Sequence, residues 1–335
     1  MSTVAITGAT GIFGKSLCAR LQEDPAVERI VGVARRPFDP AAHGWTKMEF
    51  RSGDVLKPDQ LDAAFAGADT VVHLAFTVLD RGMHPEQVRL VNVEGSANVF
   101  AAAVRAGVRR IVYASSIAAY GAWPDNPIPI PESHPTRGNP GFYYAEHKAE
   151  VEALLTAFEE QHRDVEVVRI RPCVVVGPNS VDLFRGPLPT PLVGIFLSRL
   201  LPTAFPDIGM APLQFVHEDD VAEVFALAVT APEVRGAFNL AGGGMMEAGD
   251  LAEALGAIRL PVPAGIAKVL VDVAYRARIS PTGSAWIDMA AHPVIVDTTR
   301  ARTVLGWVPK YDTRTALDDM LSRFRSTRPL ARFLP

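Results

Sequence analysis

Short apolar runs alternate, through the N-terminal part of the chain, with stretches whose apolar residues recur at helical spacing. The apolar runs lie at 4–6, 29–34, 48–51, 70–74, 110–114 and 165–171, and the helical stretches include 58–66, 85–106 and 143–161. Nearly continuous apolar strands separated by helices are typical of a parallel sheet covered on both faces. We therefore predict an α/β fold on a doubly wound parallel sheet, whose ligands bind beyond the carboxyl ends of the strands.

The pattern loosens after residue 171. Residues 123–140 contain six prolines, which predicts a surface loop. Residues 258–292 are apolar and interrupted by prolines, which favours short helices and no sheet, whereas 215–217 should return to the main sheet. The predicted main domain spans 1–180 together with 213–241 and 293–298, and a smaller, mostly helical C-terminal lobe comprises 181–212 and 242–335.

A glycine-rich turn joins the first apolar run to a helical stretch. Its sequence, Thr7-Gly8-Ala9-Thr10-Gly11-Ile12-Phe13-Gly14, has the spacing G-x-x-G-x-x-G. Such glycines let the backbone turn sharply, approach a pyrophosphate closely and pack helix on strand, although an ordinary turn also favours glycine. The start of a helix offers free N–H groups and a positive dipole end. The position after an N-terminal strand predicts a Rossmann-type dinucleotide site containing Gly8, Thr10, Gly11, Ile12, Phe13 and Gly14.

Three polar side chains are candidates for catalysis. Tyr144 and Lys148 lie four residues apart on one helix, so they share a face, whereas Tyr143 points elsewhere. A phenol with a pKa of about 10 needs that pKa lowered to exchange protons near pH 7, and a neighbouring ammonium favours this. Ser116 follows the strand at 110–114 and is placed to hydrogen-bond a substrate oxygen. Taken alone, the tyrosine and lysine would also suit an ordinary surface pair.

The composition narrows the function classes. Net charge is −4, with 48% hydrophobic and 21% charged residues, and no basic run indicates nucleic acid. Cys18 and Cys173 lie in apolar elements, which favours buried free thiols in a reducing compartment. The first residues enter a strand directly, and the apolar stretch at 260–275 is too interrupted to span a bilayer. We expect a cytoplasmic protein without a membrane anchor and, lacking metal-binding spacings, without a metal.

These motifs together resemble an extended short-chain dehydrogenase/reductase, the family that includes NAD-dependent epimerases and dehydratases. The resemblance covers most of the chain. It rests on the glycine turn and on Gly53-Asp54-Val55, His73-Leu74-Ala75, Asn92-Val93, Ser115-Ser116-x-x-x-Tyr120-Gly121, Tyr144-x-x-x-Lys148, Arg171-Pro172, Gly177-Pro178, Phe215-Val216-His217-x-Asp219-Asp220-Val221-Ala222, Phe238-Asn239 and Leu305-Gly306-Trp307.

The resemblance implies a role for each matching position. Catalysis would fall to Ser116, Tyr144 and Lys148, and Tyr144 and Lys148 would also hold the nicotinamide ribose. The remaining cofactor contacts would come from Asp54 and Val55 at the adenine, Leu74, Ala75 and Phe76 at the pyrophosphate and ribose, Asn92, and the backbone near Pro172 and Val175 at the carboxamide. The helices 85–106 and 143–161 would pair in a homodimer, and the sequence leaves a monomer equally open.

Two arginines bear on the choice of cofactor. Where an acidic residue would take the ribose hydroxyls, the chain carries Arg35-Arg36. Arginine matches phosphate geometry bidentately, which favours NADP(H) over NAD(H). The alternative is that the arginines point into solvent or stack on adenine, with NAD(H) still the cofactor.

The substrate is less defined. Relatives acting on nucleotide sugars usually carry an arginine just before the Phe-Val-His motif, but Leu213-Gln214 stands here. The lobe also offers apolar side chains that suit either a less charged substrate or, equally, the core of the lobe itself. They are Leu183, Phe184, Leu188, Val193, Phe196, Leu197, Phe205 and Met210. We predict an NAD(P)-dependent oxidoreductase acting on a carbonyl or secondary alcohol of a small, apolar molecule. The alternatives are a nucleotide-sugar epimerase or dehydratase with the same triad, and a non-catalytic NADP(H)-sensing protein.

Asp219-Asp220 and His217 are further polar residues beside an apolar strand. The two aspartates follow a strand and open a helix, so we predict that they cap that helix rather than hold a metal. His217 is predicted to be structural.

Overall fold

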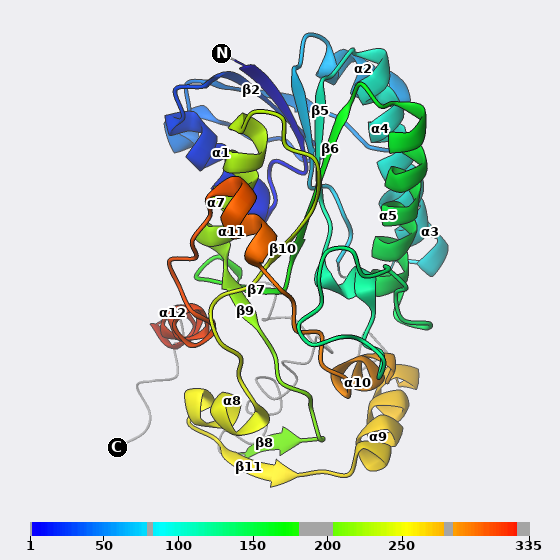
Figure 1. Ribbon diagram of the computed structural model, residues 1–335, viewed down its shortest axis with the longest axis vertical. Helices are drawn as coiled ribbons and strands as arrows, with labels where there is room; N and C mark the ends of the chain where they lie inside the picture. Colours follow the sequence, from blue (N-terminus) through cyan, green and yellow to red (C-terminus); the bar gives the residue numbers. More distant parts are fainter. Residues whose placement is uncertain (1, 79–82, 181–203, 278–283, 327–335) are drawn as a thin grey trace.

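Seven parallel strands form the central sheet of the computed structural model, which describes residues 2–78, 83–180, 204–277 and 284–326. The strand order is β10-β6-β5-β4-β1-β2-β3 (Figure 1). The strands are β1 (Ser2–Thr7), β2 (Val27–Ala34), β3 (Met48–Ser52), β4 (Thr70–His73), β5 (Arg110–Ala114), β6 (Glu166–Pro172) and β10 (Gly236–Leu240). The predicted doubly wound sheet is confirmed.

Helices cover both faces of the sheet (Figure 1). One face carries α1 (Ile12–Glu23), α7 (Glu218–Thr230) and α11 (Thr299–Leu305), and the other carries α2 (Pro58–Phe65), α3 (Pro85–Arg89), a π-helical turn (Leu90–Glu94), α4 (Gly95–Arg105) and α5 (Tyr143–Gln161). Val4 and Ile6 of β1 enter the core under α1 and α7, while Ala5 enters the core under α4 and α5. Because both faces are buried, the strands read as continuous apolar runs.

The prediction that residues 215–217 return to the main sheet is wrong. These residues form β9 (Phe215–His217), which pairs with β7 (Val174–Val176) in a separate two-stranded parallel sheet. The edge strand of the main sheet is instead β10, which pairs with β6. The apolar character of a three-residue strand does not reveal its partner, because only the tertiary structure decides it.

The smaller lobe lies beyond the carboxyl ends of the main strands (Figure 1). It contains α8 (Ala248–Leu255), α9 (Ala264–Arg276) and α10 (Ala285–Ala290), and α12 (Thr313–Ser326) packs beside β9. The absence of sheet expected over 258–292 is wrong, since β11 (Ile258–Pro261) pairs with β8 (Ala204–Asp207). Two prolines are tolerated because both strands of this pair are edges.

The proline-rich stretch at 123–140 is a loop, as predicted, but part of it is buried. Ile130 is fully buried, its N–H donates to the carbonyl oxygen of Ile295 at 2.7 Å, and its own carbonyl oxygen accepts from the N–H of Asp297 at 2.9 Å. Residues 293–298 therefore contact this loop rather than extend the sheet. A short 3₁₀ helix, η3 (Ile117–Tyr120), precedes the loop, and a second, η1 (Ala41–His43), lies between β2 and β3.

Candidate functional site

The glycine turn between β1 and α1 has the tight geometry that its sequence predicts. Gly8 has φ +75°, and a Cβ there would lie 2.7 Å from the backbone nitrogen of Ala75. A Cβ on Gly14 would overlap the carbonyl oxygen of Gly8. Both positions therefore exclude a side chain, so the turn brings the start of α1 against the ends of β1 and β4.

The N-terminus of α1 is open to a ligand. Gly11 is its N-cap, no side chain of the described residues caps it, and its first turn has no acidic residue. Thr10, Ile12 and Phe13 are partly buried around this turn. The first backbone N–H groups of a helix lack partners within the helix, so this end suits a phosphate group. The residues present fit the pyrophosphate of a dinucleotide.

Arg35 and Arg36 lie at the carboxyl end of β2, and both are exposed. Neither makes a hydrogen bond or ion pair with the described part of the chain. Asp54 and Val55 follow β3, where the Asp54 carboxylate accepts the N–H of Leu56 at 3.0 Å. These four residues lie along the same edge of the sheet as the glycine turn, since β1, β2 and β3 are parallel neighbours.

The strand β4 ends beside the glycine turn. The N–H of Leu74 donates to the carbonyl oxygen of Thr7 at 3.1 Å, and Ala75 and Phe76 follow. The Phe76 ring contacts both proposed catalytic residues of α5. Its centroid lies 3.5 Å from Lys148 Nζ, and it packs edge-on against the Tyr144 ring at 5.8 Å. Phe76 thus lies between the candidate cofactor site and the candidate catalytic residues.

Asn92 binds protein groups on the segment that follows β4. It is fully buried on the π-helical turn, and its amide binds the backbone of Thr77 on both sides, accepting the N–H at 2.7 Å and donating to the carbonyl oxygen at 3.0 Å. A second contact joins Asn92 Nδ2 and His147 Nδ1 at 3.3 Å. The residue therefore fixes the segment that follows β4, and its predicted contact with the cofactor stays a prediction.

Lys148 is buried against the rings of Phe76, which follows β4, and Tyr113 of β5. Its Nζ donates to the carbonyl oxygen of Ala114 at 2.5 Å and to Tyr113 Oη at 3.3 Å. Burial lowers the pKa of Lys148 to about 7, and the charge of Glu152 opposes that shift. The ammonium is therefore only marginally stable at neutral pH in this environment.

Tyr144 and Ser116 come together as predicted, but the expected lowering of the phenol pKa is wrong for this structure. Burial raises the pKa of Tyr144, and a hydrogen bond with Ser116 opposes the rise. Lys148 Nζ lies 5.7 Å from the centre of the Tyr144 ring and bonds to Ala114 instead. The Ser116 hydroxyl also accepts the N–H of Ala118 at 3.1 Å, so it caps η3. The phenol is therefore protonated at neutral pH.

The tyrosine that precedes the pair is directed elsewhere, as predicted. Tyr143 Oη donates to the carbonyl oxygen of Val78 at 2.7 Å, and its ring packs against His147. On the opposite side of the site, Pro172 ends β6 and Val175 is the middle residue of β7. Strand β6 is the neighbour of β5 in the sheet. Pro172 and Val175 therefore lie at the same edge of the sheet as Ser116, which follows β5.

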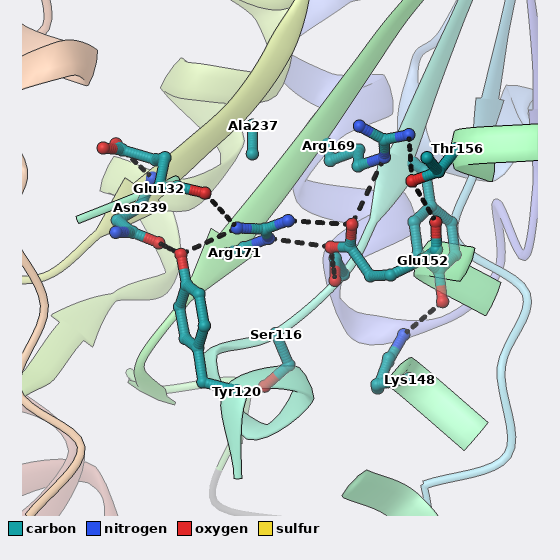
Figure 2. Close-up of polar contacts among 12 residues, drawn as sticks. Ser116, Tyr120, Glu132, Lys148, Glu152, Thr156, Arg169, Arg171, Ala237 and Asn239 are labelled. Carbon is teal, nitrogen blue, oxygen red and sulfur yellow. Dashed lines mark hydrogen bonds and ion pairs between the residues drawn. The ribbon is translucent and has the colours of Figure 1, made fainter. Parts of the chain in front are cut away.

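A group of buried charges, absent from the sequence prediction, lies behind the site. Glu152 on α5 binds Arg171 and Arg169 of β6, and Arg171 also binds Tyr120 (Figure 2). A sequence signal existed, since Glu152 stands four residues after Lys148 between the apolar Val151 and Leu155. A carboxylate on the buried face of a helix needs a partner, and arginines on the next strand supply it.

The remaining candidates are structural. His217 accepts the N–H of Asp219 at 3.1 Å, so the histidine caps α7, and its ring stacks on Tyr311 at 3.8 Å. The capping predicted for the aspartates is wrong, because Asp220 accepts the N–H groups of Lys310 and Tyr311. No group of three metal-ligating side chains lies together in the described ranges, and the metal-free expectation stays a prediction.

Most apolar candidates for the substrate lobe, namely Leu183, Phe184, Leu188, Val193, Phe196 and Leu197, lie outside the described residues. Phe205 is buried in the core of the lobe, and Met210 packs against that core. Cys18 and Cys173 are buried and free, as predicted.

In the described ranges, no helix has the length and apolar character needed to cross a membrane.

The fold and site define an extended short-chain dehydrogenase/reductase. More narrowly, the chain belongs to the NAD dependent epimerase/dehydratase family, whose model matches residues 4–241. The predicted resemblance is confirmed, and membership in this family supports an enzyme.

Three relatives illustrate the range of the family. An uncharacterized protein of Mycobacterium tuberculosis is 28% identical over 332 residues, covering 98% of this chain and 85% of the relative. A 2-alkyl-3-oxoalkanoate reductase of Shewanella oneidensis is 31% identical over 189 residues, covering 55% of this chain and 47% of the reductase. The structure of DesIV, a dTDP-glucose 4,6-dehydratase of Streptomyces venezuelae with NAD and TYD bound, superposes with a TM-score of 0.72 at 21% identity, covering 97% of this chain and 98% of the other. This last likeness concerns the fold.

Proposed function

We propose that the chain is an NAD(P)-dependent oxidoreductase that interconverts a ketone and a secondary alcohol on a small, apolar substrate. The observation that carries this proposal is the meeting of the Tyr144 phenol with the Ser116 hydroxyl, next to the Phe76 ring that also contacts Lys148. These groups lie at the carboxyl edge of the sheet, where the glycine turn opens. A bound dinucleotide supplies or accepts the hydride.

Each residue of the triad has a distinct task. Ser116 orients the substrate oxygen, and Tyr144 transfers the proton to or from it. Because burial raises the pKa of Tyr144, its phenol carries a proton at neutral pH and suits the acid role in ketone reduction. Lys148, whose pKa is lowered to about 7 by burial, would hold the ribose hydroxyls of the cofactor and place positive charge near the phenol.

The substrate class we propose is a 3-oxo ester with an alkyl branch. Support comes from the Shewanella oneidensis relative, a 2-alkyl-3-oxoalkanoate reductase, although it matches only 55% of this chain. The position before β9 also differs from that of nucleotide-sugar enzymes. Gln214 stands there, and its side chain accepts the N–H of Val296 at 2.9 Å instead of offering a cation to a diphosphate.

We propose NADP(H) as the preferred cofactor, with NAD(H) as the alternative that the bound NAD of structural relatives such as DesIV favours. Arg35 and Arg36 are exposed at the end of β2, where a 2′-phosphate would be read. The double substitution Arg35→Ser/Arg36→Ser should weaken NADPH binding about 10- to 100-fold and leave NADH binding unchanged. Arg163→Ser, an exposed arginine preceding β6, is the control. Equal losses for both cofactors would contradict the proposed preference.

An epimerase or dehydratase is the second candidate, favoured by the family model and by neighbours such as DesIV. It would use the same three residues and return the cofactor to its starting state in each cycle. The full chain should be given NADPH or NADH with branched 3-oxo esters and, separately, with nucleotide sugars. Cofactor oxidation matched by one equivalent of alcohol supports the reductase. Conversion of a nucleotide sugar without net cofactor change would replace it with the second candidate.

A further inference from the structure

Glu152 is a buried carboxylate that the proposed chemistry does not use. It lies on α5 one turn after Lys148, and only 2% of it is exposed. Its oxygens accept the Ser115 hydroxyl at 2.6 Å and the Arg171 guanidinium at 2.8 and 2.9 Å, and Arg169 Nε lies at 3.2 Å. Glu152 is thus bonded directly to the neighbour of Ser116 and placed one turn from Lys148.

Arg171 connects this carboxylate to the other side of the site (Figure 2). Its Nη1 donates to Tyr120 Oη at 2.7 Å and to the carbonyl oxygen of Glu132 at 3.0 Å. Tyr120 Oη in turn donates to Asn239 Oδ1 at 2.8 Å. The pair therefore joins α5, η3, β10 and the loop at 123–140. Such a connected buried network allows little independent movement of its members.

We propose that Glu152, held by Arg171, is a positioning residue for the proposed triad. Through Ser115 it fixes the turn that carries the Ser116 hydroxyl, and as a buried carboxylate one helical turn from Lys148 it favours the ammonium form of that lysine. This inference rests on the proposed function.

The charges behind the site support the electrostatic part. Burial acts to raise the pKa of Glu152, but the hydrogen bond and charge of Arg171, with the charge of Arg169, outweigh it, so the net pKa is lowered. Arg169 is shared with Glu159 at 2.5 Å. The charges of Glu152 and Glu159 therefore equal those of Arg169 and Arg171. Lys148 is a further buried cation beside this group.

The other groups facing Lys148 carry no compensating charge. From β5 these are the Ala114 carbonyl and the Tyr113 hydroxyl, whose pKa burial raises well above its usual range. The rings of Phe76 and Tyr144 complete the surroundings. His73 of β4 is neutral, since burial lowers its pKa to about 3. Among these neighbours, Glu152 is the group whose charge raises the pKa of Lys148 and so favours the ammonium.

The experiment measures the NADPH dissociation constant and kcat/KM against pH in the full chain. Wild-type affinity should fall as pH rises through the pKa of Lys148. In Glu152→Gln this fall should move to lower pH by about one pH unit, because the opposing charge is gone. Glu160 is an exposed glutamate on the same helix, so Glu160→Gln should leave the pH of this fall in affinity unchanged. If a folded Glu152→Gln protein loses NADPH affinity at the same pH as the wild type, the electrostatic role is overturned.

A double variant separates positioning from general damage. Breaking a buried ion pair on one side is strongly destabilising, whereas replacing both partners is tolerated better. Glu152→Gln/Arg171→Met should therefore recover stability while keeping the shifted pH dependence. Restoration of the wild-type pH dependence together with stability would show a purely structural role and refute the proposal.

Ser115→Ala tests the link to the turn. It should lower kcat about three- to tenfold, as expected for loss of one hydrogen bond of about 1 kcal/mol, with KM and NADPH affinity unchanged. An unchanged kcat would overturn this part. Lys148→Met distinguishes failure of the proposed function: if the fall in affinity with pH persists in that variant, Lys148 does not bind the cofactor, whatever Glu152 does.

Discussion

Replacing Lys148 by methionine should stabilise the protein at neutral pH while abolishing its proposed activity. The lysine is 3% exposed, and burial lowers its pKa from the ordinary 10.5 to about 7. Below pH 7 the folded protein must therefore hold a charge in surroundings that favour the neutral amine. Methionine has a similar length and no charge, so it removes this cost.

The magnitude follows from the displacement of the pKa. The difference between 10.5 and about 7 corresponds to about 5 kcal/mol at pH values below 7. The sign is opposite to that of an ion-paired lysine. Between pH 7 and 10.5 the unfolded chain binds a proton that the folded chain does not, so the wild-type free energy of unfolding gains about 1.4 kcal/mol per pH unit from this group. The variant lacks that gain.

Urea denaturation of both proteins from about pH 6 to pH 9.5 measures the effect, because the linear extrapolation gives the free energy of unfolding at each pH. The advantage of Lys148→Met should be largest near pH 6 and decline by about 1.4 kcal/mol per pH unit above pH 7. Lost hydrogen bonds shift the whole curve but not its slope. Lys57→Met, at an exposed lysine, is the control. A difference that stays constant with pH would refute the reasoning.

Three further predictions concern single positions. Tyr144→Phe should lower turnover about 10²- to 10⁴-fold, whereas Tyr143→Phe should retain it, and steady-state kinetics compare the two. Gly8→Ala should weaken NADPH binding about tenfold or more, measured by titration, because a Cβ there would lie 2.7 Å from the backbone nitrogen of Ala75. The control is Gly67→Ala, where φ is +73° and a Cβ would meet open space. It should cost about 1 kcal/mol of stability and leave NADPH affinity unchanged. Asn92→Ala should lower the free energy of unfolding by about 2 kcal/mol, measured in urea, since two backbone hydrogen bonds are lost; an unchanged stability would argue against its role in fixing the segment after β4.

The candidate site was largely predictable because its residues obey local rules. The glycine turn is recognisable from spacing, and Tyr144 and Lys148 share a helix face because they are four residues apart. The placement of Asn92 was not predictable in this way. A buried amide and an exposed one look alike in sequence, and its partner Thr77 lies fifteen residues earlier on another segment.

Long-range packing also decided the protonation states. The sequence suggested an ammonium that lowers the phenol pKa, yet Lys148 Nζ bonds to the Ala114 carbonyl, and burial raises the pKa of Tyr144. Desolvation depends on every segment that covers a group, so spacing along one helix does not reveal it.

The sequence by itself determined the parallel sheet, its two covering layers and the edge at which the site forms, because strand and helix periodicities are local and strands buried on both faces read as continuous apolar runs. Only the tertiary structure decided which strands are neighbours, as with β9 beside β7, and which charges meet, as with Glu152 and Arg171. Those pairings join residues far apart along the chain, and their free energy depends on burial that arises only when the layers close around them.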